Sequence, residues 1–278
     1  MSRTDDALEI DWHRVVLPGL GAESTVLVAG AGGAIGRRVA FALGALGGNV
    51  VLMGRTEPGL EETADLIAAP DRVAIVAGDI AAEADGRRAV EAAVARFGGL
   101  TGVVNAAAVS DAGLPFGSID RAAIDQVMGP NLFGAIFLSQ AAFPALRESG
   151  GGSIVHVGSV EAYRAQPGKL LYGTSKAALL RVASQLAIEG GPDGIRVNCV
   201  SAGQTPTPLI AHDATPGSPR LRPASNAASL GAESIPIGRR GVLDDYVGVT
   251  FFLLSDLAAY VTGKDVPAEG GVLNRRLR

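Results

Sequence analysis

The stretch STVLVAGAGGAIG, residues 24–36, decides the fold. Its first half, Ser24–Ala29, is short, apolar and rich in β-branched residues, as is typical of a strand buried in a parallel sheet. A helical pattern begins at about residue 35, and between strand and helix lie Gly30, Gly32, Gly33 and Gly36. Glycine lets a backbone turn tightly and approach a pyrophosphate, and the following helix N-terminus offers free N–H groups. The stretch therefore favours a dinucleotide site, although glycines also make ordinary turns between strand and helix.

The rest of the chain alternates between strand and helix patterns. Apolar runs predict strands at 49–53, 72–76, 101–105, 153–157 and 195–200, and a short final strand beginning at 265–267. Helical patterns cover 35–46, 57–68, 82–96, 118–147, 172–189 and 243–255. Such repeated units predict a parallel sheet with helices on both faces. We therefore expect an α/β fold, a Rossmann-type doubly wound parallel sheet of about seven strands in a single domain.

The ends of the chain and one internal segment depart from this pattern. We expect an N-terminal extension over 1–23, then the domain over 24–273 and a solvated tail over 274–278. Trp12 is expected to anchor the extension by packing onto the domain or onto a neighbouring subunit. Residues 204–234 hold five prolines and several Ser, Ala and Asn. A loop this long inside a compact domain is usually a lid or binding segment, or else disordered. We interpret it as lid-like.

Composition and charge exclude several classes of protein. Lys plus Arg number 24 and Asp plus Glu 28, and this near-balance argues against a nucleic-acid partner. Apolar residues make up 47% and charged residues 19%, which excludes disorder. The uncharged stretch 126–146 is too polar and too broken for a membrane helix, and the acidic N-terminus is no secretory signal. Without a membrane helix the chain is expected to be soluble. Its single cysteine, Cys199, fits a reducing compartment, so we expect a cytoplasmic location.

Histidine and cysteine spacing argues against a metal site. His13, His156 and His212 lie far apart in the sequence, and Cys199 is the lone cysteine. His156 lies inside the strand at 153–157, so we interpret it as a packed core histidine.

The second strand ends in Gly54 and Arg55, with no acid before Glu57. An acidic residue at this place would bind the adenosine ribose and select NAD, whereas a guanidinium can pair with the 2′-phosphate of NADP. The alternative is an arginine that is merely solvated in a loop. The pattern favours NADP(H) over NAD(H).

Four polar residues follow one another at suggestive intervals. Tyr172 and Lys176 are one helical turn apart and so share a helix face. Ser159 comes thirteen residues before Tyr172, just after an apolar strand, where active sites of open α/β sheets lie. Asn131 sits in an uncharged helical stretch. Taken singly, each could be an ordinary structural residue.

Together with the glycine turn, these residues resemble the classical short-chain dehydrogenase/reductase (SDR) family over residues 24–273. Further matching segments are Asp79, Asn105-Ala106-Ala107-Ala108, 202–207, 235–239, 261–263 and 270–271. Three motifs depart from the family pattern, at Ala34 in the glycine turn, at Ala106 and Ala108 after the fourth strand, and at Ala202 before Gly203. None of these changes removes a reacting group.

The resemblance implies a catalytic tetrad of Asn131, Ser159, Tyr172 and Lys176. Tyr172 would be the general acid/base and Ser159 would hold the substrate oxygen. Lys176 would bind the nicotinamide ribose, and Asn131 would order a water that links Lys176 to solvent. The ordinary tyrosine pKa near ~10 is high for this task, so we expect Lys176 and an oxidised nicotinamide to lower the pKa of Tyr172.

The resemblance also implies cofactor contacts and an assembly. Asp79 would meet the adenine amino group, Asn105 and its neighbours the adenosine, and Thr207 the nicotinamide carboxamide. The full set expected to bind the cofactor is Gly30, Gly32, Gly33, Ile35, Gly36, Arg55, Asp79, Ile80, Asn105, Ala106, Tyr172, Lys176, Gly203 and Thr207. By analogy with the family, we expect a homo-oligomer, a tetramer or a dimer, formed through the helices that carry Asn131 and Tyr172.

The function expected from these residues is NADP(H)-dependent interconversion of a carbonyl and a secondary alcohol of a small molecule. An NAD-dependent dehydrogenase of a secondary alcohol or cyclic diol is an alternative, and so is a non-catalytic dinucleotide-sensing protein. Specificity would lie in loops near 110–116, 160–170 and 205–234. Their apolar residues predict a partly apolar pocket: Leu114, Phe116, Leu170, Leu209 and Ile210. The same loops carry Arg164, Lys169 and His212.

Overall fold

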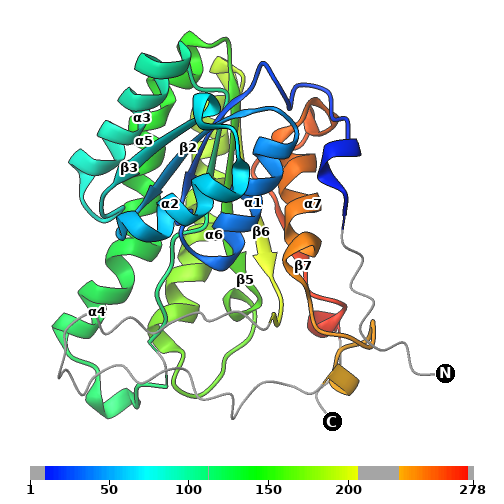
Figure 1. The fold of residues 1–278 in the computed structure, drawn as a ribbon. Coiled ribbons are helices and arrows are strands. Elements are labelled where there is room, and N and C mark those ends of the chain that lie inside the picture. Colours follow the sequence, from blue (N-terminus) through cyan, green and yellow to red (C-terminus); the bar gives the residue numbers. More distant parts are fainter. Residues whose placement is uncertain (1–9, 112, 206–231, 275–278) are drawn as a thin grey trace.

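The fold is seen in a computed structural model that describes residues 10–111, 113–205 and 232–274. Its seven strands form one parallel sheet in the order β3-β2-β1-β4-β5-β6-β7 (Figure 1). The strands are β1 (Thr25–Ala29), β2 (Asn49–Gly54), β3 (Val73–Ala77), β4 (Gly102–Asn105), β5 (Gly152–Ser159), β6 (Ile195–Ala202) and β7 (Asp265–Ala268). The expected Rossmann-type sheet is thereby confirmed, short final strand included.

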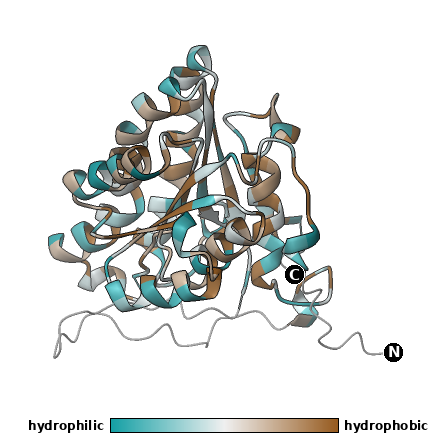
Figure 2. Cartoon of the chain, turned by 45° about the horizontal axis from the view of Figure 1, so that its top comes forward, coloured by the Kyte–Doolittle hydropathy of each residue, from teal (hydrophilic) through white to brown (hydrophobic). Residues whose placement is uncertain are grey.

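Helices cover both faces of the sheet. They are α1 (Ala34–Ala45), α2 (Glu57–Ile67), α3 (Glu83–Phe97), α4 (Arg121–Met128), α5 (Gly134–Glu148), α6 (Leu170–Gly190) and α7 (Leu243–Leu254). Successive side chains of a strand point to opposite faces, so Val26 and Val28 pack with α1, α2 and α7, while Leu27 and Ala29 pack with α3, α5 and α6. Figure 2 shows the hydrophobic strands at the centre and hydrophilic residues on outer helix surfaces. No helix in the described ranges is long and apolar enough to cross a membrane.

One predicted helix is wrong in detail. The helical segments expected over about 118–147 are α4 and α5, and a π-helical turn, Gly129–Phe133, lies between them where the uncharged helix with Asn131 was expected. Helix α4 starts at Arg121 because the carboxylate of Asp120 accepts a hydrogen bond from the Ala123 N–H (2.9 Å) and caps it. The regular ladder breaks at Pro130, which has no N–H to donate to the preceding turn. Asn131 therefore lies in the π turn rather than within a regular helix.

The segment before β1 is anchored by Trp12, as expected. Trp12 is 3% exposed and meets the Phe251 ring edge-to-face at 5.0 Å. Its indole Nε1 donates to Oδ1 of Asp244 (3.2 Å), and Arg38 donates to the same carboxylate from Nε (2.6 Å) and Nη2 (2.8 Å). Burial by itself would raise the pKa of Asp244, but these hydrogen bonds and the Arg38 charge outweigh it and hold the pKa below its ordinary value.

His156 is a core residue, also as expected. It is fully buried on β5, with Nε2 3.5 Å from the Ser139 hydroxyl. Burial, and secondly the nearby Lys176 charge, lower the pKa of His156 from 6.5 to about 4.

This lowered pKa makes folding stability depend on pH. Between pH 6.5 and about 4 the unfolded chain binds a proton at His156 that the folded chain does not, so the free energy of unfolding falls as pH falls through this window. The change in pKa corresponds to about 3 kcal/mol. Urea unfolding should show this loss in the wild type and in His13→Asn, whose histidine is exposed, and a smaller loss in His156→Asn. Equal pH dependence in all three proteins would contradict the assignment.

Candidate functional site

The carboxyl ends of the strands bring most of the expected site residues to one edge of the sheet. The parallel register places Ala29 of β1 beside Asn105 of β4, and β5 and β6 end side by side at Ser159 and Ala202. The strand order reverses between β1 and β4, which are neighbours although two strands lie between them in the chain. Ligands of open α/β sheets bind at such a switch point.

The glycine turn lies at this switch point, and close backbone contacts leave no room for a side chain at two of its glycines. Gly30 has φ +78°, and a Cβ there would lie 2.7 Å from the Ala107 nitrogen. A Cβ on Gly36 would lie 2.2 Å from the Gly30 carbonyl oxygen. Helix α1 has no side-chain cap, and its first helical hydrogen bond runs from Arg37 N–H to Gly33 O (2.7 Å). The backbone amides before Arg37 therefore precede the helical ladder, which fits a pyrophosphate cradle.

The other residues expected to contact a dinucleotide follow neighbouring strands. Asp79 follows β3, and its Oδ1 accepts the Ala81 N–H (2.9 Å). Ile80 is buried beside it. Asn105 ends β4 and is buried, and Ala106 donates its N–H to Ala29 O (2.9 Å).

Two more of these residues lie at the sheet edge, and one cannot be placed. Gly203 follows β6 and donates its N–H to Ala268 O (3.0 Å). Arg55 is exposed just beyond β2, and no partner for its guanidinium is found in the described part of the chain. Thr207, His212 and most of the lid-like loop lie outside the described residues.

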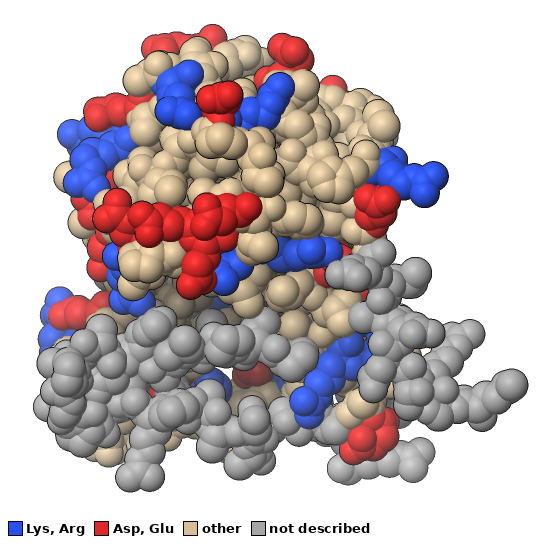
Figure 3. Space-filling view, viewed as in Figure 1, with Lys and Arg blue, Asp and Glu red and all other residues tan. Residues whose placement is uncertain are grey.

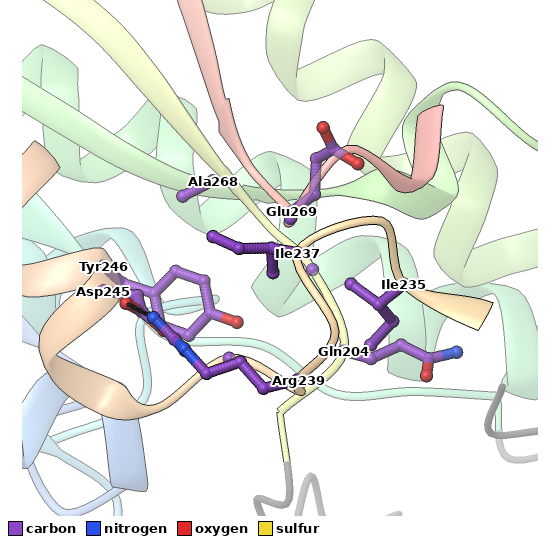
Figure 4. Close-up of a pocket in the computed structure, with 11 residues that line it drawn as sticks. Gln204, Ile235, Ile237, Arg239, Asp245, Tyr246, Ala268 and Glu269 are labelled. Atoms are coloured by element: carbon purple, nitrogen blue, oxygen red, sulfur yellow. Dashed lines mark hydrogen bonds and ion pairs between the residues drawn. The ribbon is translucent and has the colours of Figure 1, made fainter. Parts of the chain in front are cut away.

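A cavity of about 190 Å³ opens beyond β6 and β7, next to Gly203 (Figure 4). In this view Ile237 lies between Tyr246 and Ile235, which give the cavity an apolar wall. Arg239 pairs with Asp245 through two hydrogen bonds, Nη1 to Oδ2 (2.6 Å) and Nη2 to Oδ1 (2.8 Å). The sequence motif at 235–239 thus shapes a recess adjoining the expected dinucleotide site.

Ser159, Tyr172 and Lys176 come together in the interior. Ser159 ends β5, and Tyr172 and Lys176 lie in the first two turns of α6, all three of them buried. A hydrogen-bonding interaction with the Ser159 side chain lowers the pKa of the Tyr172 phenol. Lys176 Nζ donates to Val157 O (2.7 Å) and lies 5.8 Å from the centroid of the Tyr172 ring. The spacing of four residues does place the ammonium beside the ring.

The pKa of Tyr172 departs from the expectation. Burial foremost raises it to about 12; the Ser159 hydrogen bond lowers it, and the charges of Glu161 and Asp111 raise it further. The expected lowering by Lys176 is not found among these contributions, and the lowering expected with a bound oxidised nicotinamide stays a prediction. Burial and two carboxylates raise the pKa of Tyr172 by more than the Ser159 hydrogen bond lowers it. Burial also lowers the pKa of Lys176, to about 8.

Asn131 is a positioning residue in this structure. Its Oδ1 accepts the Val109 N–H (2.8 Å), and its Nδ2 donates to Val109 O (2.8 Å) and to the Ser175 hydroxyl (3.0 Å). Ser175 in turn donates to Tyr172 O (2.7 Å). The buried carboxamide thus ties the chain after β4 to the first turn of α6, and both of its N–H groups are engaged in doing so.

Sequence reasoning missed Asp111 and Glu161. Asp111 is 1% exposed, and its Oδ2 accepts the N–H groups of Leu171 (2.8 Å) and Tyr172 (3.4 Å), so it caps α6 from a loop sixty residues away in sequence. Glu161 donates its backbone N–H to the Ser159 hydroxyl (3.2 Å). No local pattern signals such a distant cap, whereas an acid two residues after Ser159 could have been noticed.

The loops expected to give a partly apolar pocket are arranged differently. Leu114 packs into a small core with Val109, Val127 and Leu171, and Phe116 is 82% exposed. Lys169 does reach the site, because its Nζ donates to the Ser110 hydroxyl (2.6 Å) and lies 5.6 Å from the Tyr172 ring centroid. The described parts of these loops thus place a polar side chain beside Tyr172, while Leu209 and Ile210 lie outside the described residues.

Charge on the face seen in Figure 3 is mixed, with a group of acidic side chains over α2. The exposed acids of this helix are Glu57, Glu61, Glu62 and Asp65. Glu62 pairs with Arg37 of α1 (Nη2 to Oε2, 2.8 Å). Arg55, directly at the end of β2, is a basic side chain that precedes this group of acids.

Comparison with known proteins agrees with this geometry. A family model described as enoyl-(acyl carrier protein) reductase matches residues 30–273. L-rhamnose 1-dehydrogenase (NAD(P)(+)) of Azotobacter vinelandii is 36% identical over 259 residues, which cover 90% of this chain and 96% of that protein. Levodione reductase of Leifsonia aquatica is 31% identical, over 90% of this chain and 94% of that protein.

Solved structures give the same result. A short-chain type dehydrogenase/reductase from Mycobacterium ulcerans has a TM-score of 0.81 and 32% identity, covering 92% of both chains. A structure from Brucella melitensis titled as an SDR and a glucose/ribitol dehydrogenase has a TM-score of 0.80 and 30% identity, covering 92% of this chain and 99% of that one. The chain thus belongs to the short-chain dehydrogenase/reductase family, and it is an NAD(P)-dependent oxidoreductase that acts on CH–OH groups.

Proposed function

We propose that this enzyme interconverts a carbonyl and a secondary alcohol with NADP(H), and that Tyr172 moves the proton. The observation that carries the proposal is the convergence of three buried side chains, Ser159, Tyr172 and Lys176, at the same sheet edge as the glycine turn. The proposed proton-transfer group and the proposed phosphate-binding turn would then act on one substrate and one dinucleotide bound together. The bound dinucleotide would accept or supply the hydride, and the protein would orient the reactants and transfer the proton.

Each residue of the tetrad has a distinct task in this mechanism. In reduction, the Tyr172 hydroxyl donates its proton to the carbonyl oxygen; in oxidation, the phenolate takes the proton of the alcohol. Without substrate, the Ser159 hydrogen bond favours the phenolate form of Tyr172. With substrate bound, Ser159 would donate its one hydroxyl hydrogen to the substrate oxygen instead. Lys176, buried beside the ring, would hold the nicotinamide ribose and add positive charge near the phenolate. Asn131 keeps the first turn of α6 in place.

The relatives' names support both directions of this reaction. One is named a dehydrogenase of L-rhamnose and another a reductase of levodione, and a third, from Rhodococcus sp., is named cyclohexanol dehydrogenase. An assay of alcohols with NADP⁺ and of carbonyls with NADPH tests the proposal directly. Binding of a dinucleotide with no turnover of either class would favour the sensing protein instead.

The preference for NADP(H) rests on Arg55. Its guanidinium is exposed at the end of β2, has no partner in the described part of the chain, and is preceded by Gly54, which carries no side chain. A phosphate can accept two hydrogen bonds from such a guanidinium. The 2′-phosphate of NADP(H) would therefore be bound by Arg55.

Arg55→Glu is expected to raise the Kd of NADPH about 10- to 100-fold, the usual range for loss of a charge-assisted hydrogen bond, and to change the Kd of NADH far less. Fluorescence titration of both nucleotides measures this. Lys264→Glu makes the same charge change just before β7, at the opposite edge of the sheet, and should leave both constants unchanged. Tighter binding of NADH than NADPH by the wild type would overturn the preference and favour the NAD-dependent alternative.

A further inference from the structure

Three charged side chains lie near Tyr172 and a fourth, Arg164, lies beside one of them; the mechanism uses none of the four. This polar cluster consists of Asp111, Glu161, Arg164 and Lys169. Nη2 of Arg164 lies 4.0 Å from Oε1 of Glu161. The charges of both carboxylates raise the pKa of the Tyr172 phenol. The charges of the other three members also shift the pKa of Glu161. The cluster therefore forms one local environment around the proposed proton-transfer group.

Several of its polar atoms have no hydrogen-bond partner, although they are buried. Within the described ranges these atoms are Asp111 Oδ1, Glu161 Oε2 and the Nε and Nη2 of Arg164. Buried polar groups are nearly always hydrogen-bonded, because an unpaired one loses its hydration without compensation. Such atoms are paired by ordered water or by a ligand, and their place next to the proposed proton-transfer group is where a bound substrate would displace water and supply the partners.

The chemistry of the unmet atoms defines the ligand. Two carboxylate oxygens can only accept hydrogen bonds, and two guanidinium N–H groups can only donate them. A hydroxyl group both donates and accepts, so adjacent hydroxyls would satisfy both kinds of atom. The cluster holds two negative and two positive residues, so it offers no net charge to a carboxylate or phosphate. An apolar alcohol would leave all four atoms unpaired.

We infer that the substrate is an uncharged polyhydroxylated compound, an aldose, ketose or polyol. Its reacting oxygen would lie at Ser159 and Tyr172, and its neighbouring hydroxyls at Asp111, Glu161 and Arg164. The inference rests on the proposed function for the position of the reacting carbon. It goes beyond that function by assigning the specificity of the site to the polar cluster.

The test compares substrates that differ mainly in the number of hydroxyl groups. A panel of aldohexoses, inositols and cyclohexanol is assayed with NADP⁺ and with NAD⁺, and kcat/KM is measured for each. Binding to the dinucleotide-saturated protein is measured separately from the shift in melting temperature. We expect at least one polyhydroxylated compound to exceed cyclohexanol in kcat/KM by about 100-fold or more, because a site built to bond hydroxyls rejects analogues that lack them.

Arg164→Met removes the two unmet donors and keeps an unbranched, though shorter, side chain. The ratio of kcat/KM for the best polyhydroxylated compound to that for cyclohexanol should fall about 10- to 100-fold, mainly through KM. Arg181→Met, an exposed position farther along α6, should keep the wild-type ratio. Arg164→Met also removes the ion pair with Glu161 (4.0 Å), so the melting temperature without ligand should fall slightly. A purely structural role predicts that fall with an unchanged kcat/KM ratio, whereas a ligand contact predicts the changed ratio.

The outcomes separate this inference from the proposed function. A preference for cyclohexanol, or equal losses for both kinds of substrate in Arg164→Met, overturns the inference and leaves the proposed function intact. A polyhydroxylated compound that raises the melting temperature but is never oxidised supports the assignment of the cluster and contradicts the proposed function. If NADPH binds and no polyhydroxylated compound either binds or reacts, the inference is wrong.

Discussion

Replacing Tyr172 by phenylalanine is expected to lower kcat by about 10³-fold, within the range usual for loss of a general acid or base. The change removes one oxygen atom and keeps the buried ring, so the packing of α6 is preserved. Ser159 can still donate a hydrogen bond to the substrate oxygen, but no group remains that can give a proton to that oxygen or take one from it. The Kd of NADPH, measured by fluorescence titration, should stay within about twofold of the wild-type value because the cradle is untouched.

Tyr163→Phe provides the matched control for this variant. Tyr163 lies nine residues earlier, is half exposed, and donates its hydroxyl to Oδ2 of Asp265 (2.6 Å) rather than to Ser159. The same chemical change there should leave kcat close to wild type. Retained turnover in Tyr172→Phe, or an equal loss in both variants, would contradict the role of Tyr172.

The second large effect is expected from Gly36→Ala. The new Cβ would lie 2.2 Å from the Gly30 carbonyl oxygen and 2.7 Å from its carbon. These are backbone atoms of the turn itself, and no side-chain rotation can relieve the contact. The turn must shift, and with it the amides at the start of α1 that are proposed to bind the pyrophosphate. We expect the Kd of NADPH to rise about 100-fold or more, with a stability loss of about 1–3 kcal/mol from overpacking.

Gly44→Ala separates damage to the cradle from loss of stability. The new Cβ would also be too close to a neighbour, 2.4 Å from Cγ2 of Ile67 in α2. This neighbour is a side chain, and Gly44 lies at the end of α1 far from the glycine turn. This variant should be destabilised and should still bind NADPH with nearly wild-type affinity. If the two variants lost affinity equally, the claim that Gly36 shapes the dinucleotide site would be wrong.

Much of the fold could be predicted because each local signal agrees with the tertiary structure. The strands buried on both faces are near-continuous apolar runs, and glycine marks the turn after β1. The π-helical turn between α4 and α5 was missed even though Pro130 was visible, because apolar helical periodicity continues across it. The expected homo-oligomer stays a prediction.

The site was predictable where the topology alone brings residues together. Strand ends in a parallel sheet meet at one edge, so Asn105 and Ser159 were placed correctly from the order of strands. The cap of α6 by Asp111 depends on a contact across sixty residues, which no periodicity encodes. The raised pKa of Tyr172 was missed because burial and the neighbouring carboxylates dominate it, and sequence spacing reveals neither.

The most direct test of the central claim is isotope transfer from substrate to dinucleotide. The wild-type enzyme is incubated with NADP⁺ and the substrate of highest kcat/KM, deuterated at its carbinol carbon, and the reduced dinucleotide is analysed by mass spectrometry. The account predicts that the NADPH formed carries the deuterium, and that Tyr172→Phe forms far less of it in the same time. NADPH without deuterium, or equal amounts from both proteins, would contradict hydride transfer from a carbinol carbon assisted by Tyr172.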